Sequence, residues 1–147
     1  MNWSLILILA AIGVILSALI VFGILPATIW LSLGFVLIAA VVIGHQVSHK
    51  IFLHGFLTAV IWSVIGGALQ FIFWDKFMAN NPQVQAKMAQ VPEGMDIRPW
   101  MAGGMVVGAV AYGAILGGLA MLFAKLLGEE KKEVPTESEN QDQTPVS

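Results

Sequence analysis

The chain contains no cysteine, and only 11% of its 147 residues are charged, against about a quarter in an ordinary soluble domain. The missing cysteines exclude disulfides, thiolate metal sites and thiol nucleophiles. The charges that exist are segregated, because residues 1–49 contain no Asp, Glu, Lys or Arg at all. A soluble fold of this size has no way to bury that much uninterrupted apolar surface. The formal net charge of -2 gives no reason to expect a nucleic acid as a partner.

Long apolar segments make up most of the chain, and 58% of its residues are hydrophobic. Four such segments cover about residues 3–25, 28–47, 51–74 and 100–127. Each is near the roughly 20 residues that a helix needs to cross a hydrocarbon layer of about 30 Å. Backbone groups in lipid must be hydrogen-bonded within their own segment, so the spans are predicted to be helices. The sequence therefore predicts an all-α membrane domain over residues 1–127, with four transmembrane helices in an antiparallel bundle surrounded by the lipid bilayer.

The links between these spans differ in length and polarity. The first is short and uncharged, which predicts a hairpin of the first two spans with Pro26 in the first turn of the second helix. Residues 75–99 form a long loop, where Asn81 is suited to cap a helix that starts at Pro82. A short helix at the membrane interface and an irregular loop are both consistent with this segment. Residues 128–147 are acidic and almost free of apolar side chains, which predicts a disordered tail.

Positive charge is divided unevenly between the two sides of the predicted membrane domain. Four spans place both termini on the same side, together with four lysines, whereas the long loop carries two lysines and one arginine. The positive-inside rule then predicts a multi-pass protein of the plasma membrane, which is the inner membrane in a bacterium, with both termini in the cytoplasm.

Three histidines, His45, His49 and His54, lie around the second link. His45 and His49 are four residues apart, so on a continuous helix they share one face and could bind a metal ion together. A break near residues 48–50 would bring His54 to the same place. Two interpretations stay open: a metal or haem site, and ordinary polar residues at a membrane surface. The absence of a nearby Asp, Glu or Cys favours the second, so no cofactor is predicted outright.

Small residues follow helical spacing in the third and fourth spans. Small side chains let helix backbones approach closely, and packing of that kind drives helix association in lipid. We therefore expect the third and fourth spans to pack along these faces, within one chain or between copies. The residues that we assign to this packing are Ala59, Ser63, Gly66, Gln70, Gly104, Gly108, Gly113 and Gly117.

Charged residues inside a span usually mark transport or proton-relay function, since a charge in lipid is costly. The four spans contain only one, Lys125, and it is close enough to the end of the last span to reach the interface. Gln70 is the main polar group within a span, and its carboxamide is able to hydrogen-bond across helices. The sequence offers no catalytic set, so we expect a protein that is not an enzyme.

The segment before the last span carries two proline-containing tracts, Asn80-Asn81-Pro82 and Pro92-Glu93-Gly94-Met95-Asp96-Ile97-Arg98-Pro99-Trp100. Followed by a glycine-rich helix, these tracts resemble those of uncharacterised small bacterial four-helix membrane proteins. The resemblance covers roughly the second half of the chain and rests on no catalytic signature. It implies a bacterial inner-membrane protein and no particular mechanism.

These observations favour a non-enzymatic membrane protein whose helices pack with further copies of the chain, as a homo-oligomer, or with a membrane partner subunit. Two alternatives stay open. The histidine cluster would make the chain a metal- or haem-binding membrane module. Ser63, Gln70 and the glycine faces would instead line a small channel or carrier for a neutral solute.

Overall fold

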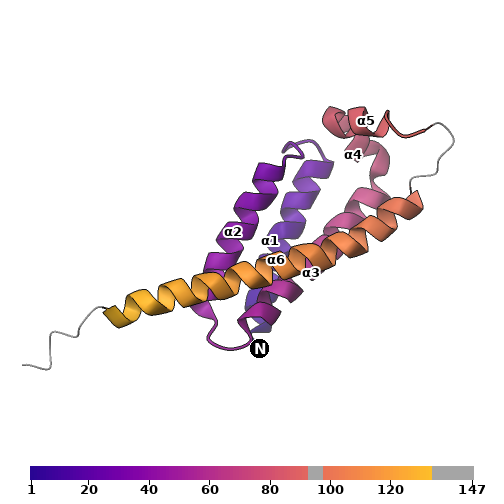
Figure 1. Ribbon diagram of the computed structural model, residues 1–147. Helices are drawn as coiled ribbons and strands as arrows, with labels where there is room; N and C mark the ends of the chain where they lie inside the picture. Colours follow the sequence, from indigo (N-terminus) through magenta and orange to yellow (C-terminus); the bar gives the residue numbers. More distant parts are fainter. Residues whose placement is uncertain (93–97, 134–147) are drawn as a thin grey trace, which may run out of the picture.

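The computed structural model describes residues 1–92 and 98–133, with the backbone alone for residues 98–101 and 129–133. The described residues form six helices and no strand (Figure 1). The fold class is therefore all-α, as the sequence predicts. The helices are α1 (Trp3–Val21), α2 (Ile29–Gln46), α3 (Ile51–Ile72), α4 (Trp74–Asn80), α5 (Pro82–Met88) and α6 (Arg98–Glu133).

Within the described residues, four helices are long and apolar enough to cross a membrane, namely α1, α2, α3 and α6. Only 28–39% of each apolar window is buried inside the structure, so most of its surface faces outward. Large apolar side chains are exposed on every one of these helices, for example Ile8, Ile38, Ile65 and Val107. Such a surface is stable in lipid and not in water. The prediction of four helices of membrane-spanning length is confirmed.

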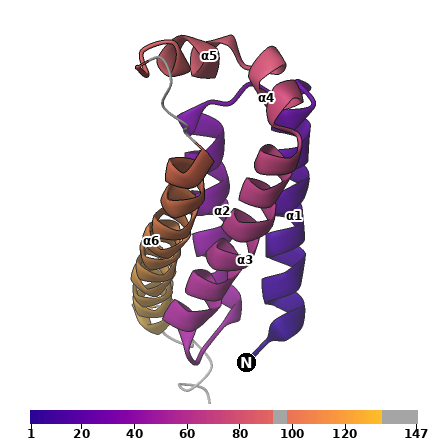
Figure 2. The ribbon, with the colours of Figure 1, turned by 90° about the vertical axis from the view of Figure 1, so that its right-hand side faces the viewer.

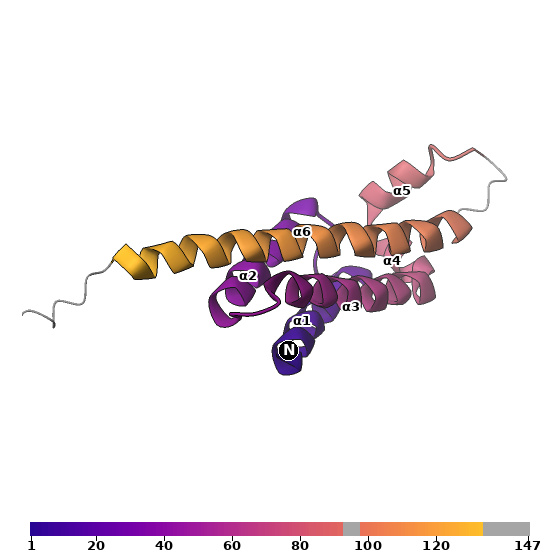
Figure 3. The same cartoon turned by 60° about the horizontal axis from the view of Figure 1, so that its bottom comes forward.

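The four long helices do not pack as two sequential hairpins. α3 makes its most extensive contacts with α6, α2 also packs on α6, and α1 packs on α3. The short link over residues 22–28 reverses the chain, but it does not make α1 and α2 packing partners, because they touch little. Figure 2 shows the chain direction alternating from one long helix to the next. In Figure 1 α6 crosses α2 obliquely, and in Figure 3 it runs alongside α3.

Glycine allows α3 and α6 to touch backbone to backbone. A Cβ atom placed on Gly55 would lie 2.8 Å from the Cα atom of Gly117, and one on Gly117 would lie 2.7 Å from the carbonyl oxygen of Phe52. Gly113 lies under the Phe56 ring in the same way, one turn earlier on α6. Gly113 and Gly117 of α6 therefore lie directly against α3, Gly113 at Phe56 and Gly117 at Phe52 and Gly55.

Gly44 has the same role between α2 and α6. A Cβ atom on Gly44 would lie 2.9 Å from the backbone carbonyl oxygen of Ala120 and 2.9 Å from the backbone nitrogen of Ala124. Residues 113–117 of α6 pack against α3, and residues 120–124 pack against α2. This part of α6 therefore contacts two helices in succession.

The turn after α1 depends on Gly23. Its φ of +76° is a left-handed conformation that suits glycine just beyond a helix end. A Cβ atom there would lie 2.8 Å from Cγ of Asn80, whose amide nitrogen donates a hydrogen bond to the Val21 carbonyl (3.1 Å). Helix α2 begins only at Ile29, so Pro26 lies in the link and not in the first helical turn, contrary to expectation.

Asn81 ties the long loop to the first link. Its amide nitrogen donates to the carbonyls of Ile20 (3.3 Å) and Phe77 (2.8 Å), and its oxygen accepts from the Ala27 N–H (3.2 Å). The sequence predicts a helix cap here, and α5 does begin at Pro82, but the Asn81 side chain makes no capping hydrogen bond to α5. Asn81 instead adds a second hydrogen bond to the Ile20 carbonyl at the end of α1, which also accepts from the Gly23 N–H (3.1 Å).

Two further boundaries differ from those predicted. The loop contains two short helices, α4 and α5, where the sequence suggests a single interfacial helix or none. Helix α6 runs through Glu133, so residues 128–133 are helical although the sequence assigns them to the disordered tail. Glu and Lys are good helix formers, which explains why the helix continues beyond its apolar part. The rest of the expected tail, residues 134–147, lies outside the described residues.

A leucine at Gly117 tests the crossing of α3 and α6. The change adds up to about 1 kcal/mol of helix propensity but forces the side chain into the Phe52 backbone, so we expect a net destabilisation of about 1–3 kcal/mol. Gly118→Leu is the matched control, because a Cβ atom at that neighbouring position meets nothing within 4 Å. Thermal unfolding in detergent measures both variants. Equal unfolding midpoints would contradict the backbone contact.

Candidate functional site

The buried core fills one half of the molecule, towards the N-terminus and the link between α2 and α3 (Figure 1). We call this the terminal half, and we call the other, beside α4 and α5, the loop half. The terminal half comprises residues 3–13, 35–47, 51–62 and 113–124, and the loop half comprises residues 16–21, 29–34, 63–72 and 102–112. The core side chains of the terminal half include Leu5, Leu9, Phe35, Val36, Ile43, Val47, Ala59, Leu116 and Ala120.

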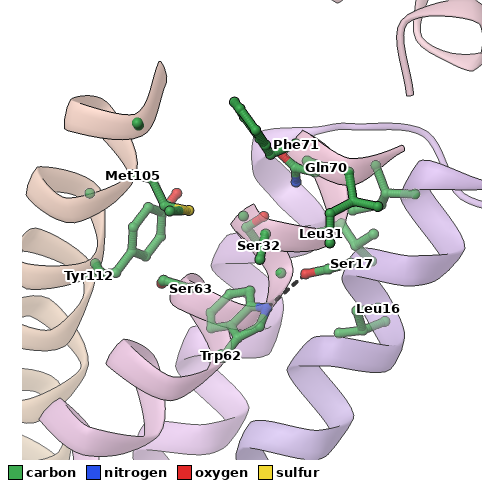
Figure 4. A pocket seen from close by; sticks show the side chains of 18 residues that line it. Leu16, Ser17, Leu31, Ser32, Trp62, Ser63, Gln70, Phe71, Met105 and Tyr112 are labelled. Atoms are coloured by element: carbon green, nitrogen blue, oxygen red, sulfur yellow. Dashed lines mark hydrogen bonds between the residues drawn. The ribbon is translucent and has the colours of Figure 1, made fainter. Parts of the chain in front are cut away.

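A cavity of about 560 Å³ occupies the loop half, among α1, α2, α3 and α6 (Figure 4). Its size falls within the range of roughly 300–1,000 Å³ that is typical of sites for small organic ligands. The described residues that line it include no charged side chain. Its walls are mainly apolar and include Leu16, Ile20, Leu31, Phe71, Met105 and Ala109.

Trp62 of α3 forms the floor of this cavity. Its indole nitrogen donates a hydrogen bond to the Ser17 hydroxyl of α1 (3.0 Å), which in turn donates to the Gly13 carbonyl (3.0 Å). The Trp62 ring meets Phe35 of α2 in a T-shaped contact with centroids 4.9 Å apart. It also meets Tyr112 of α6 with centroids 6.1 Å apart. One side chain therefore connects all four spanning helices.

Two glycines make room for this arrangement between α1 and α3. A Cβ atom on Gly13 would lie 2.5 Å from Cγ of Trp62, and one on Gly66 would lie 2.5 Å from the Ser17 hydroxyl oxygen. A larger residue at either position would push the two helices apart. The hydrogen bond between Trp62 and Ser17 thus depends on small residues on both helices.

Four polar side chains line the cavity and have no hydrogen-bond partner among the described residues: Ser32, Ser63, Gln70 and Tyr112. Ser32 lies in the first turn of α2 and Gln70 in the last turn of α3, so both are near the loop end of the cavity. Hydroxyl and carboxamide groups can both donate and accept hydrogen bonds. These groups are therefore available to a molecule that enters the cavity.

The cavity exists because α6 diverges from the other helices in the loop half. A Cβ atom on Gly104 or Gly108 would meet nothing within 4 Å, whereas one on Gly113 would overlap α3. Here α6 reaches α3 through Met105, whose flexible side chain lies over Gly67. The larger of the two hollows described here therefore lies in the loop half, where α6 diverges, and glycine-mediated contacts bring the helices together in the terminal half.

His45 and His49, the pair considered for metal binding, do not share a helix. His45 is exposed in the last turn of α2, which ends at Gln46, and His49 follows in the link. A hollow of about 300 Å³ between α2 and α6 includes His45, but its described lining holds no second histidine and no carboxylate. Across residues 1–92 and the described part of α6, no three His, Cys, Asp or Glu side chains are grouped to hold a metal. The metal or haem hypothesis gains no support from this arrangement.

His54 is buried away from the other two histidines. Its Nε2 atom accepts a hydrogen bond from the Asn2 backbone N–H (2.9 Å), and its Nδ1 atom lies 2.9 Å from the Lys50 carbonyl oxygen. Because Nε2 acts as an acceptor, the ring proton is on Nδ1 and is donated to that carbonyl. Both ring nitrogens are therefore used to join the start of α1 to the start of α3.

The residues predicted to pack the third and fourth spans have different surroundings in the structure. Ser63 and Gln70, which the sequence also assigns to a possible solute path, are at the cavity. Gly113 and Gly117 lie against α3, Ala59 is in the core, and Gly66 lies against Ser17 of α1. Ser63, Gln70 and Gly108 are at the cavity, and a Cβ atom on Gly104 would meet nothing within 4 Å among the described residues.

Sequence reasoning does not single out Trp62, and it assigns Asn81 a different role, that of a helix cap. A signal for Trp62 does exist, because tryptophan is typical of membrane interfaces and this one is in the middle of a span. Its N–H has no water to bond at that depth and needs a partner on a neighbouring helix. For Asn81 the sequence carries a competing signal, since the same residue is well suited to cap the helix that follows it.

No protein family, curated protein or solved structure matches this chain. The resemblance of the second half to small bacterial membrane proteins stays an expectation.

Ser17→Ala tests the floor of the cavity. The change leaves the buried Trp62 N–H without an acceptor, so we expect a loss of about 1–2 kcal/mol in the free energy of unfolding. Denaturant unfolding in detergent measures it. Trp62→Phe removes the donor, so Ser17→Ala should cost much less in that background. The same cost in both backgrounds would mean that the hydrogen bond is not what Ser17 contributes.

Proposed function

We propose that this chain is an integral membrane protein that binds a small, largely apolar molecule in the cavity among its four spanning helices. The observation that carries the proposal is the cavity of about 560 Å³, with its apolar walls and unpaired polar groups. A concave, mainly apolar surface of this size is typical of small-molecule sites, and burying the apolar surface of a ligand against it is favourable.

The shape of the site supports a carrier or receptor over a channel. Trp62 and the packed terminal half close the cavity at its inner end, so its space does not continue across the molecule. A channel needs a continuous path, whereas a binding site needs only one opening. The serine hydroxyls of the described lining have no base beside them to activate them, which supports binding without catalysis.

Gly108→Leu is expected to fill the cavity without disturbing the fold. Gly108 lines the cavity, and a Cβ atom there meets nothing within 4 Å. We expect saturable photolabelling of the purified protein by a diazirine-bearing long-chain alcohol to weaken about tenfold or more, with thermal stability kept or raised. Gly34→Leu is the matched control, because its Cβ is also free and it lies outside the lining. Equal labelling of the two variants would count against the proposed site.

A second candidate function is assembly through α6, which the sequence favours. Gly104, Ala111 and Gly118 are exposed, and a Cβ atom on either glycine would meet nothing within 4 Å. The three residues are spaced seven apart, so they lie along one side of α6. An exposed side made of small residues is what close helix association in lipid requires. A second copy of the chain or a partner subunit would pack there.

We also place the protein in a bacterial inner membrane with both termini in the cytoplasm. The N-terminus, the link that contains Lys50 and the end of α6 lie at one end of the structure (Figure 1). α4 and α5, with Lys76 and Lys87, lie at the other end. The lysine distribution and the positive-inside rule support this orientation.

Gly104→Leu tests assembly through α6. A bulky side chain on the exposed side of the helix should block close approach, so we expect the variant to shift towards monomer while its thermal stability is kept. Native mass spectrometry and chemical cross-linking in mild detergent measure the oligomeric state, with Gly34→Leu as a control on another helix. Wild-type protein that stays monomeric at every concentration would rule out self-association.

A further inference from the structure

The cavity holds polar groups that a hydrocarbon ligand would leave unsatisfied. Gln70 and Ser32 are half-buried near the loop end of the cavity, and neither side chain has a hydrogen-bond partner among the described residues. A carboxamide offers two donor hydrogens and an acceptor oxygen. In a low-dielectric site an unmade hydrogen bond costs free energy, which a ligand with a matching polar group would recover.

The described lining of the cavity has no charged side chain that would neutralise a bound ion. The described residues of its lining include no Asp, Glu, Lys, Arg or His, and it lies within helices of membrane-spanning length. Moving an unpaired charge into such a site is costly. The occupant that fits this lining is therefore uncharged, and its polar group is one that both the carboxamide and a hydroxyl recognise, such as an alcohol, a carbonyl or an amide.

The polar part of the cavity lies at its loop end, and the apolar part extends from there to the floor. Gln70 lies at the loop end and Trp62 at the floor, and Figure 4 shows the two side chains at opposite ends of the space. They are eight residues apart on α3, which corresponds to about 12 Å along the helix axis. Apolar side chains such as Leu16 and Ile20 of α1 lie along this depth. A molecule with one polar end and an apolar body matches this order.

The surroundings of the cavity indicate where such a molecule comes from. Phe71 and Ile72 line the cavity and are also exposed, at 47% and 70%, on a surface suited to lipid. An amphiphile in the adjacent leaflet already has its polar end at the interface and its apolar body directed inward. It would enter in the orientation that the cavity favours, with no need to turn over.

We propose that the cavity binds an uncharged amphiphile taken from the bilayer leaflet on the side of α4 and α5. Its polar end hydrogen-bonds to the Gln70 carboxamide, and its apolar body extends along α1 and α3 to the Trp62 ring. This assignment rests on the binding function proposed above and adds the chemical class of the ligand, its orientation and the residue that selects it.

Three photoreactive probes with the same alkyl chain and diazirine test the ligand class: an alkane, a primary alcohol and a carboxylate. The full chain is purified in nanodiscs of uncharged lipid, and labelled peptides are mapped by mass spectrometry. We expect saturable labelling in the α3 and α6 segments that line the cavity. The alcohol should label at about a tenfold lower concentration than the alkane or the carboxylate, as one hydrogen bond made at a buried site would give.

Gln70→Leu tests the selecting residue and should remove the advantage of the alcohol over the alkane. Gln46→Leu, the same exchange at an exposed position at the far end of α2, should keep it. A thermal unfolding midpoint close to that of the wild type shows that the Gln70→Leu protein is folded. If Ser63→Ala removes the preference and Gln70→Leu does not, the proposed orientation is overturned.

The possible results distinguish a failure of the proposed ligand class from a failure of the proposed binding function. Equal saturable labelling by alkane and alcohol, or strongest labelling by the carboxylate, would overturn the ligand class and leave the binding function standing. The absence of saturable labelling by all three probes would overturn both. Preference for the alcohol that disappears in Gln70→Leu alone would support the full assignment.

Discussion

The hydrogen bond between the Trp62 indole nitrogen and the Ser17 hydroxyl (3.0 Å) holds α1 against α3 where Gly13 and Gly66 let the two helices approach, and the arrangement of the other helices centres on the same tryptophan. Lipid chains are as apolar as leucine, so helices in a membrane are held by packing and by bonds of this kind more than by the hydrophobic effect. Since the Trp62 ring also touches Phe35 and Tyr112, it relates α2 and α6 to the first pair. The same ring separates the packed half of the molecule from the open half.

Helix α6 has different surroundings along its length, and this difference creates the candidate site. In the terminal half Gly117 meets Gly55 backbone to backbone, and Gly44 brings α2 equally close. In the loop half Gly104 and Gly108 meet no neighbouring helix. Helices are nearly straight, so two helices that touch at one end and cross at an angle move apart towards the other end. The cavity is the consequence of that geometry, and glycine positions decide in which half it opens.

The loop next to the open half is fixed to the bundle by amide side chains. Asn80 and Asn81 bond carbonyls at the end of α1, and Asn81 also accepts a hydrogen bond from the first link. α4 and α5 are therefore held beside the cavity, although they are short. In the binding function proposed above, the site lies between the spanning helices, and the unpaired Gln70 would supply the polar selectivity that the apolar walls lack.

The sequence by itself determined the number of spanning helices, because a charge-free run of about 20 apolar residues has only one stable state in lipid. It also identified Gly113 and Gly117 as packing residues and Gln70 as the polar group of interest, since small and polar residues are conspicuous in an apolar span. Only the tertiary structure decided that α1 pairs with α3, that His54 bonds Asn2 and that Asn81 serves α1 in preference to its own helix. The hydrogen bonds behind these pairings join residues 45 to 61 positions apart. Local spacing carries no information about such pairs, because they depend on the crossing angles of whole helices.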